Sequence, residues 1–199
     1  MMTSKRMKST VAFVVAISSV GILDVAYSAY YNRDAFFSGN GLPDAAIAEL
    51  VYWESQGVSD LGYSGFCLDA RWEFDKVENA VINFRRATSN EINNSKLRFW
   101  ADDFGDTSWY GHMTPYDIYG NPLVNEGTAW SKTDVQLNDA KMDKHNFVAN
   151  ERRKVVVHEL GHVLSMRHQP EGTSSVMQDD RNTYWYLSPL DVSNLQYMY

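Results

Sequence analysis

The sequence of 199 residues has one cysteine, Cys67, and therefore cannot form an intramolecular disulfide. Basic residues are also fewer than acidic ones: the chain has 18 Lys and Arg but 25 Asp and Glu, which gives a formal net charge of -7. This acidic balance argues against binding to DNA, RNA or an anionic membrane, so we expect no nucleic-acid partner. Glycine and proline number only 12 and 5, which excludes a collagen-like or low-complexity chain. The length fits one globular domain with a short appendage.

A long hydrophobic run is missing as well. The apolar stretch at residues 11–23 has 13 residues, whereas a helix that spans a bilayer needs about 20. It follows three basic residues and precedes the small-residue site Ala26-Tyr27-Ser28, which is the layout of a secretory signal peptide. We expect cleavage of residues 1–28 to leave a secreted, extracellular monomer without a stable membrane anchor. Cleavage removes three basic residues and one acidic residue, so the net charge falls from -7 to -9.

The rest of the chain divides into two regions. Residues 29–65 form an N-terminal extension or pro-segment, in which apolar residues at helical spacing predict a helix between residues 42 and 57, followed by a Gly/Ser-rich connector. Residues 66–199 form the main domain.

Within the main domain, a first helix is predicted at residues 75–88. Alternating apolar and polar residues predict strands at residues 96–104 and 133–139, with long loops and a short edge strand between them. Together these elements predict an α+β or α/β fold in which helices pack on a mixed sheet.

Three of the five histidines fall within eleven residues. A long helix is predicted from an N-cap at Asn150 to about Leu164. In this helix, His158 and His162 lie about 40° apart on one face, so both imidazoles can reach one metal ion at about 2.0–2.1 Å. Glu159 flanks the same face and can reach a water on the metal without being a ligand.

The third histidine requires a change of direction in the chain. His168 would lie about 15 Å from His158 along the axis of a continuing helix. To bind the same ion, the chain must leave the helix near Ser165 and double back. Three neutral histidines with one open position are typical of catalytic zinc rather than of structural zinc. Zinc would lower the pKa of a bound water to about 7, and Glu159 could take its proton and return it to a leaving amine.

The segment HELGHVLSMRH (residues 158–168) resembles the His-Glu-x-x-His-x-x-Gly-x-x-His motif of the metzincin zinc metalloproteases. Met177, in Ser175-Val176-Met177, is similar to the methionine of the tight Met-turn under the zinc in that clan. The tail at residues 186–199 resembles the closing helix of the matrixin branch, with Ser188 and Asp191 as a capping box. In that family the acidic residue matching Asp191 is buried and braces the Met-turn.

The resemblance, which spans residues 66–199, implies a metzincin fold with a mostly parallel twisted sheet, an active-site helix, a Met-turn and a C-terminal helix. It implies a secreted zinc endopeptidase with one catalytic zinc. The zinc ligands would be His158, His162 and His168, with Glu159 as general base and Met177 in support. A peptide or protein substrate would pair with the strand at residues 133–139 or the strand just before it. Residues 178–186 would form the wall of a specificity pocket.

Three positions depart from the family pattern. Ser165 stands where the family usually has Gly at the helix exit, and a left-handed serine costs about 1 kcal/mol. Gln136 falls where many matrix metalloproteases have a histidine of a second, structural zinc, so we expect no such site here. Asp179 replaces the tyrosine ligand of the astacin and serralysin branches, which favours the matrixin branch.

Other readings stay open at this point. Asp102, Asp103 and Asp106 could contribute to a Ca²⁺ site or form a solvated acidic turn. Cys67 could bind the zinc in a latent form or be a buried free thiol. We expect His112 and His145 to be surface or loop residues rather than ligands. For function, the alternatives are a secreted protein that retains zinc without proteolysis and a zinc hydrolase that acts on non-peptide substrates.

Overall fold

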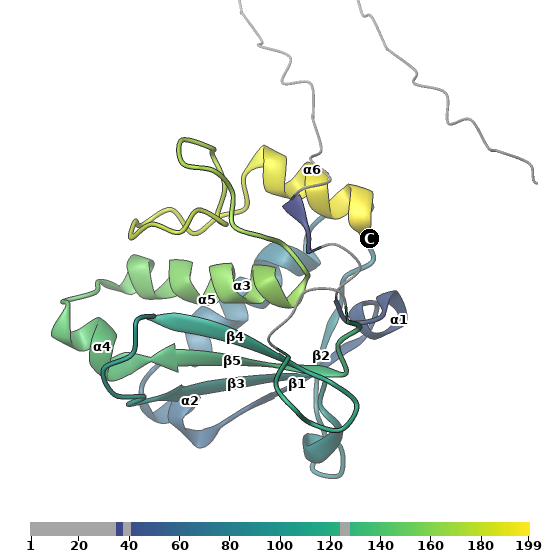
Figure 1. Ribbon diagram of the computed structural model, residues 1–199, viewed down its shortest axis with the longest axis horizontal. Coiled ribbons are helices and arrows are strands. Elements are labelled where there is room, and N and C mark those ends of the chain that lie inside the picture. The colour runs from purple at the N-terminus through teal and green to yellow at the C-terminus, as the bar shows by residue number, and fades with distance from the viewer. Residues whose placement is uncertain (1–34, 38–40, 124–127) are drawn as a thin grey trace, which may run out of the picture.

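The computed structural model describes residues 35–37, 41–123 and 128–199 (Figure 1). The predicted signal peptide, residues 1–28, lies outside the described residues. None of the helices in the described ranges is long and apolar enough to span a membrane.

Five strands form one mixed sheet in the order β2-β1-β3-β5-β4. Their bounds are Leu50–Glu54 for β1, Phe84–Arg86 for β2, Leu97–Asp102 for β3, Gly111–Tyr116 for β4 and Lys132–Asn138 for β5. The strands pair in parallel except β4, which pairs antiparallel with β5 at the edge of the sheet. The predicted mixed sheet is therefore confirmed, as are the strands expected at residues 96–104 and 133–139 and the short edge strand between them.

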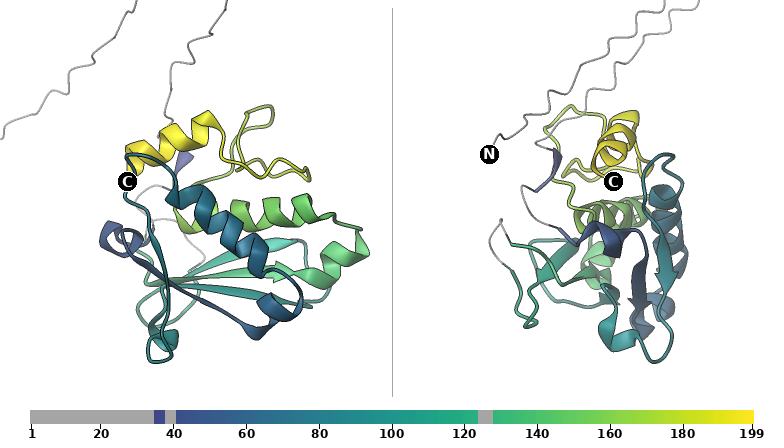
Figure 2. Two further views of the ribbon diagram at one scale, coloured as in Figure 1. Left: turned by 180° about the vertical axis from the view of Figure 1, so that it is seen from behind. Right: turned by 90° about the vertical axis from the view of Figure 1, so that its right-hand side faces the viewer.

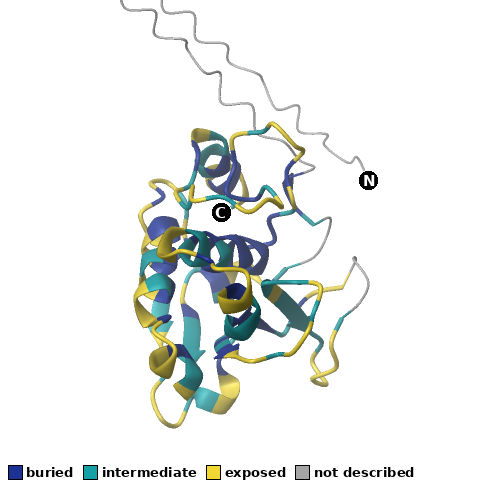
Figure 3. Ribbon diagram, turned by 90° about the vertical axis from the view of Figure 1, so that its left-hand side faces the viewer, coloured by how far each residue is buried: buried dark blue, intermediate teal, exposed yellow. Residues whose placement is uncertain are grey.

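The helices are α1 (Asp44–Ile47), α2 (Gln56–Asp60), α3 (Ser64–Asp75), α4 (Asp139–Lys144), α5 (Ala149–Val163) and α6 (Pro189–Met198), with a short 3₁₀ helix, η2, at Ile92–Asn94. Helices α3 and α5 lie side by side over one face of the sheet, and α6 lies beyond α5 (Figures 1 and 2). Every residue of α5 from Val156 to Val163 is buried, so this helix forms the centre of the core (Figure 3).

The strands show the alternation expected of a sheet covered mainly on one face. In β3, Leu97, Phe99 and Ala101 are buried, whereas Arg98 and Trp100 between them are half-buried on the opposite face. There Arg98 forms a bidentate ion pair with Asp134 of β5, with both N···O distances at 2.6 Å.

The helix predicted between residues 42 and 57 was wrong. Asp44–Ile47 is helical and α2 begins at Gln56, but Leu50–Glu54 between them forms β1. Val51, Tyr52 and Trp53 are β-branched or aromatic, and β1 pairs with β2 on one side and β3 on the other. This pairing overrides an apolar spacing that, over so few residues, fits a helix as well as a strand.

The helix predicted at residues 75–88 was also wrong. The helix α3 begins at Ser64, within the predicted connector, and it ends at Asp75, where the predicted helix was to begin. Phe84–Arg86, at the end of the predicted helix, forms β2. The hydrophobic pattern of α3 is obscured because Arg71 and Glu73 are buried, while Leu68 and Trp72 are exposed.

At the start of α5 the N-cap is Val148 rather than Asn150, and the Val148 N–H donates to the Glu151 carboxylate at 2.8 Å. The predicted start of α6 is confirmed: Ser188 is its N-cap, Pro189 is its first residue, and Ser188 and Asp191 form a capping box.

The predicted boundary at residue 65 falls within α3. The strand β1 comes before this boundary but lies between β2 and β3, so residues from 41 onward fold together with the rest of the chain. Export of the chain and cleavage after residue 28 stay predictions.

Candidate metal centre

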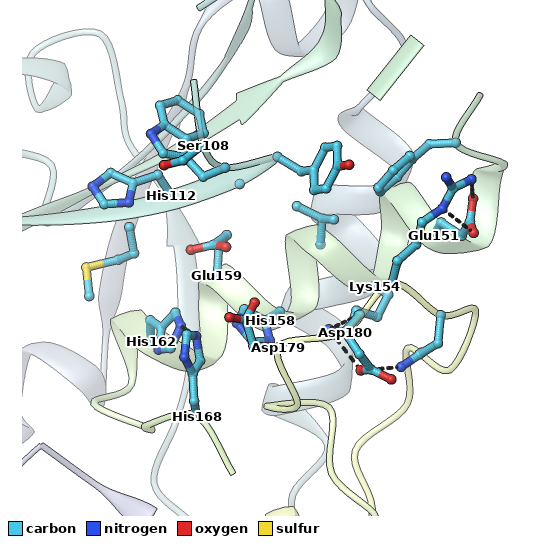
Figure 4. Close-up of a pocket in the computed structure, with 18 of the residues that line it drawn as sticks. Ser108, His112, Glu151, Lys154, His158, Glu159, His162, His168, Asp179 and Asp180 are labelled. Atoms are coloured by element: carbon cyan, nitrogen blue, oxygen red, sulfur yellow. Dashed lines mark hydrogen bonds and ion pairs between the residues drawn. The ribbon is translucent and has the colours of Figure 1, made fainter. Parts of the chain in front are cut away.

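The three predicted histidine ligands meet at the C-terminal end of α5 (Figure 4). One ring nitrogen each from His158, His162 and His168 lies within 4.8 Å of the others, and this group could hold a metal ion. The ring centroids are 4.7 to 5.0 Å apart. The geometry on which the sequence prediction depended is therefore present.

The chain reverses direction at Ser165, which has a φ of 64°. The Ser165 N–H donates to the His162 carbonyl at 2.9 Å, and the Met166 N–H donates to the Gly161 carbonyl at 3.0 Å. These two bonds are those of a Schellman motif, which usually places glycine at the left-handed position. Serine adopts the same conformation here at a cost of about 1 kcal/mol, and His168 thereby returns to the end of α5.

Backbone carbonyls orient two of the imidazoles. The His158 Nδ1 lies 3.0 Å from the Val176 carbonyl oxygen, and the His162 Nδ1 lies 2.7 Å from that of Met166. If each Nδ1–H donates to its carbonyl, each Nε2 is left unprotonated and available to a metal ion. The Nε2 atoms of His162 and His168 are 3.0 Å apart, close to the about 3.3 Å between two nitrogens that bind one tetrahedral zinc ion.

The protonation state of the buried histidines also suits a metal. Burial lowers the pKa of His158 well below its ordinary value and lowers that of His162 to about 4. Both imidazoles are therefore neutral at pH 7, which is the form that binds metal ions.

The turn with Met177 lies directly under α5. Met177 is fully buried, and its Sδ occupies the space where a Cβ on Gly161 would lie. The Asp191 carboxylate of α6 accepts hydrogen bonds from the Ser175 hydroxyl at 2.5 Å and the Val176 N–H at 2.9 Å. Because the Val176 carbonyl in turn contacts His158, Asp191 supports a candidate ligand through one turn.

Glu159 is buried beside the histidines and lines the same cleft (Figure 4). Its burial raises the pKa of the carboxyl group to about 8, and the charge of Lys154 and a backbone hydrogen bond from Met113 act in the opposite direction. A carboxyl group that can hold or release a proton near neutral pH suits general acid–base chemistry.

Strand β4 approaches Glu159 closely at Gly111, a position that sequence reasoning missed. A Cβ at Gly111 would lie 2.5 Å from Val155 Cγ1 and 2.7 Å from Glu159 Cγ. We expect Gly111→Ala to push β4 away from α5 and to lower the free energy of unfolding by about 1–3 kcal/mol, measured by urea denaturation. Gly65→Ala is the matched control, because outside its chain neighbours and its own helix backbone no atom lies within 4 Å of the added Cβ. Equal stability of the two variants would contradict the close approach.

The histidines and Glu159 open onto a cleft of about 740 Å³. Its lining includes residues of β4, of α5 and of the loop after Met177, where residues 179–182 are part of the pocket wall predicted at residues 178–186. Of the two strands considered for substrate pairing, β5 lies between β3 and β4, so only β4 is at the edge of the sheet. At one end of β4 the Leu123 N–H donates to the Pro115 carbonyl, so the chain itself covers the edge of the strand there. At the other end, Gly111, His112 and Met113 line the cleft.

Lys154 is a further cleft residue that sequence reasoning missed. It is buried, and its Nζ donates to the carbonyl oxygens of Gln178 at 2.5 Å and Asp180 at 3.0 Å. Lys154 thus fastens the loop after the Met-turn to α5. The signal in the sequence is its position four residues before His158, which places both side chains on one face of the helix.

The alternative ligands do not join the centre. Cys67 is fully buried in the core, its burial raises the pKa of the thiol, and it is not part of the histidine group. The carboxylates of Asp102 and Asp103 accept local backbone hydrogen bonds, and Asp106 lies 3.6 Å from Lys144. These three aspartates are not among the described groups that could hold a metal ion.

His112 and His145 are both exposed and are not part of the metal-binding group. His112 stacks on Trp109 and lines the cleft. The His145 Nδ1 lies 2.6 Å from the Tyr110 hydroxyl. Gln136 accepts a hydrogen bond from the Thr114 hydroxyl at 3.3 Å.

Comparison with known proteins gives little that bears on this site. No protein-family model and no curated protein matches the chain. Among solved structures, the chain is similar to one described as "GM1 bound form of the ECX AB5 holotoxin", with a TM-score of 0.42 and 16% identity over 79% of this chain and 74% of that chain. A likeness this distant carries no argument about function, which therefore has to be argued from the geometry.

Proposed function

We propose that this chain is a secreted zinc-dependent endopeptidase of the metzincin type, nearest to the matrixin branch. The observation that carries the proposal is the convergence of His158, His162 and His168 beside the Glu159 carboxyl group in an open cleft. Three further features support the same proposal, because each matches a feature of the family that the sequence resembles. They are the Schellman turn at Ser165, the buried Met177 and the hydrogen bond from the Val176 N–H to the Asp191 carboxylate.

Zinc is the metal we propose because three neutral imidazoles leave a fourth position open, as in catalytic zinc sites. When bound, zinc would supply a water of pKa about 7 and polarisation of the scissile carbonyl group. The Val176 and Met166 carbonyls hold His158 and His162 in the orientation that such an ion requires.

Glu159 is the residue that moves protons in this proposal. In its ionised form the carboxyl group accepts a proton from the attacking water, and the carboxylic acid so formed donates that proton to the leaving amine of the cleaved peptide bond. Its burial and its place on the cleft wall keep the carboxyl group next to the histidines without making it a ligand.

The substrate in this proposal is an extended peptide that pairs with β4. Gly111, His112 and Met113 of this edge strand line the cleft, so a strand added there lies along the three histidines. Asp179, Asp180, Arg181 and Asn182 line the cleft from the Met-turn side, where they would contact substrate side chains.

The test is a peptidase assay on the exported protein with a mixed peptide library. We expect cleavage within peptide chains, its loss after treatment with a chelator, and its return when stoichiometric Zn²⁺ is added. Tight zinc binding without peptide cleavage would favour a zinc-retaining binding protein, and zinc-dependent hydrolysis of esters or glycosides alone would favour a non-peptide hydrolase. Either result would overturn the proposal.

A further inference from the structure

A short segment before the sheet lies against the loop that carries His168. The Arg167 N–H donates to the Ala35 carbonyl at 2.7 Å, and the Phe37 N–H donates to the Ser165 carbonyl at 2.9 Å. These bonds flank an antiparallel bridge between Phe36 and Met166. Ala35 and Phe36 are buried, so residues 35–37 pack as part of the fold beside the loop, held by this single bridge.

The loop at residues 165–168, which residues 35–37 contact, positions two of the three candidate ligands, His162 and His168. Its central residue, Met166, supplies the carbonyl that contacts the His162 Nδ1 at 2.7 Å. Its last bonded residue, Arg167, directly precedes His168 in the sequence. Residues 35–37 therefore bond to the loop on either side of Met166. These bonds lie in the sequence between His162 and His168, whose Nε2 atoms are 3.0 Å apart.

The side chain of Phe37 extends the contact into the cleft. Its ring centroid lies 5.9 Å from that of His162 and 5.9 Å from that of Trp130. Phe37 also lines the cleft next to the histidines. The segment thus contacts the site through its backbone and through one aromatic ring.

We propose that residues 35–37 are a positioning segment of the metal centre, which holds His168 in place for metal binding. This inference rests on the proposed metal site and goes beyond it, because it states what the chain before the sheet does. Without this segment, the loop at residues 165–168 would have to be ordered when the metal binds, which would weaken the affinity. It follows that residues 29–65 are not a removable pro-segment and that any processing that leaves an active protein cuts before Ala35.

The test compares Phe37→Pro with Phe37→Ala. Both variants lack the ring, but only proline removes the N–H that donates to Ser165. We expect the proline variant to bind Zn²⁺ about 10–100-fold more weakly than the alanine variant, measured by competition with a chromophoric chelator. We also expect the visible spectrum of the Co²⁺-substituted protein, which reports on the ligand set, to change in the proline variant alone.

A second comparison uses chains that begin at Ala29 and at Gly41. We expect the shorter chain to unfold cooperatively but to bind Zn²⁺ as weakly as the proline variant does. Equal affinities in either comparison, with tight binding by the unaltered chain, would overturn this inference and leave the proposed function standing. Loss of cooperative unfolding in both altered chains would also overturn it, because the segment would then be needed for the whole fold. If the unaltered chain bound no zinc, both the inference and the proposed function would fail.

Discussion

The variant Glu159→Gln is expected to cleave peptides about 10²–10⁴-fold more slowly than the unaltered protein while it keeps its zinc. Glutamine has nearly the same shape as glutamate and can occupy the same buried place against β4. Its amide group cannot accept a proton from the attacking water. The loss should therefore appear in kcat, because the variant retains the cleft and the three histidines.

Zinc content and peptide cleavage are measured on the same preparation, so the two effects can be separated. Glu171→Gln is the matched control, because Glu171 is exposed in the loop after His168 and does not line the cleft. We expect it to cleave at the unaltered rate. Parallel loss of zinc and activity in Glu159→Gln would mean that the carboxyl group supports the metal site instead of the proton transfer.

The part of the site that could be predicted from the sequence is the part set by local geometry. His158 and His162 share a face because of the pitch of one helix, and Ser165 marks the reversal because the motif requires the chain to turn there. Likewise, Ser188 and Asp191 form their capping box within one helical turn. Each of these features is settled within about a dozen residues.

Features that depend on distant segments were missed. The strand β1 was predicted as a helix because its apolar spacing fits both structures, and only pairing with β2 and β3 decides between them. Helix α3 was missed because it buries Arg71 against Glu54, with an N···O distance of 2.6 Å, and so lacks a clean apolar face. Residues 35–37 and the His168 loop are about 130 residues apart in the sequence, so no local sequence pattern could have predicted their contact.

The variant Asp191→Ala is expected to lower the free energy of unfolding by about 3–5 kcal/mol, because it leaves several buried hydrogen-bond donors without an acceptor. Asp191 is fully buried and accepts from Ser175 and Val176 in the Met-turn and from the Ser188 N–H at 2.9 Å. The apolar methyl group of alanine replaces none of these bonds. Urea denaturation of the zinc-free protein measures the loss.

Loss of the Asp191 carboxylate should also affect the candidate metal centre. The Val176 carbonyl contacts the His158 Nδ1 at 3.0 Å, so a displaced turn would release the imidazole and weaken zinc binding. Ser193→Ala on the same helix is the matched control, because its half-buried hydroxyl donates to the Pro189 carbonyl of the same helix and the change should cost less than about 0.5 kcal/mol. If Asp191→Ala destabilised the fold but left zinc affinity unchanged, α6 would stabilise the domain without orienting His158. A loss of both would mean that Asp191 supports His158 through the Val176 backbone.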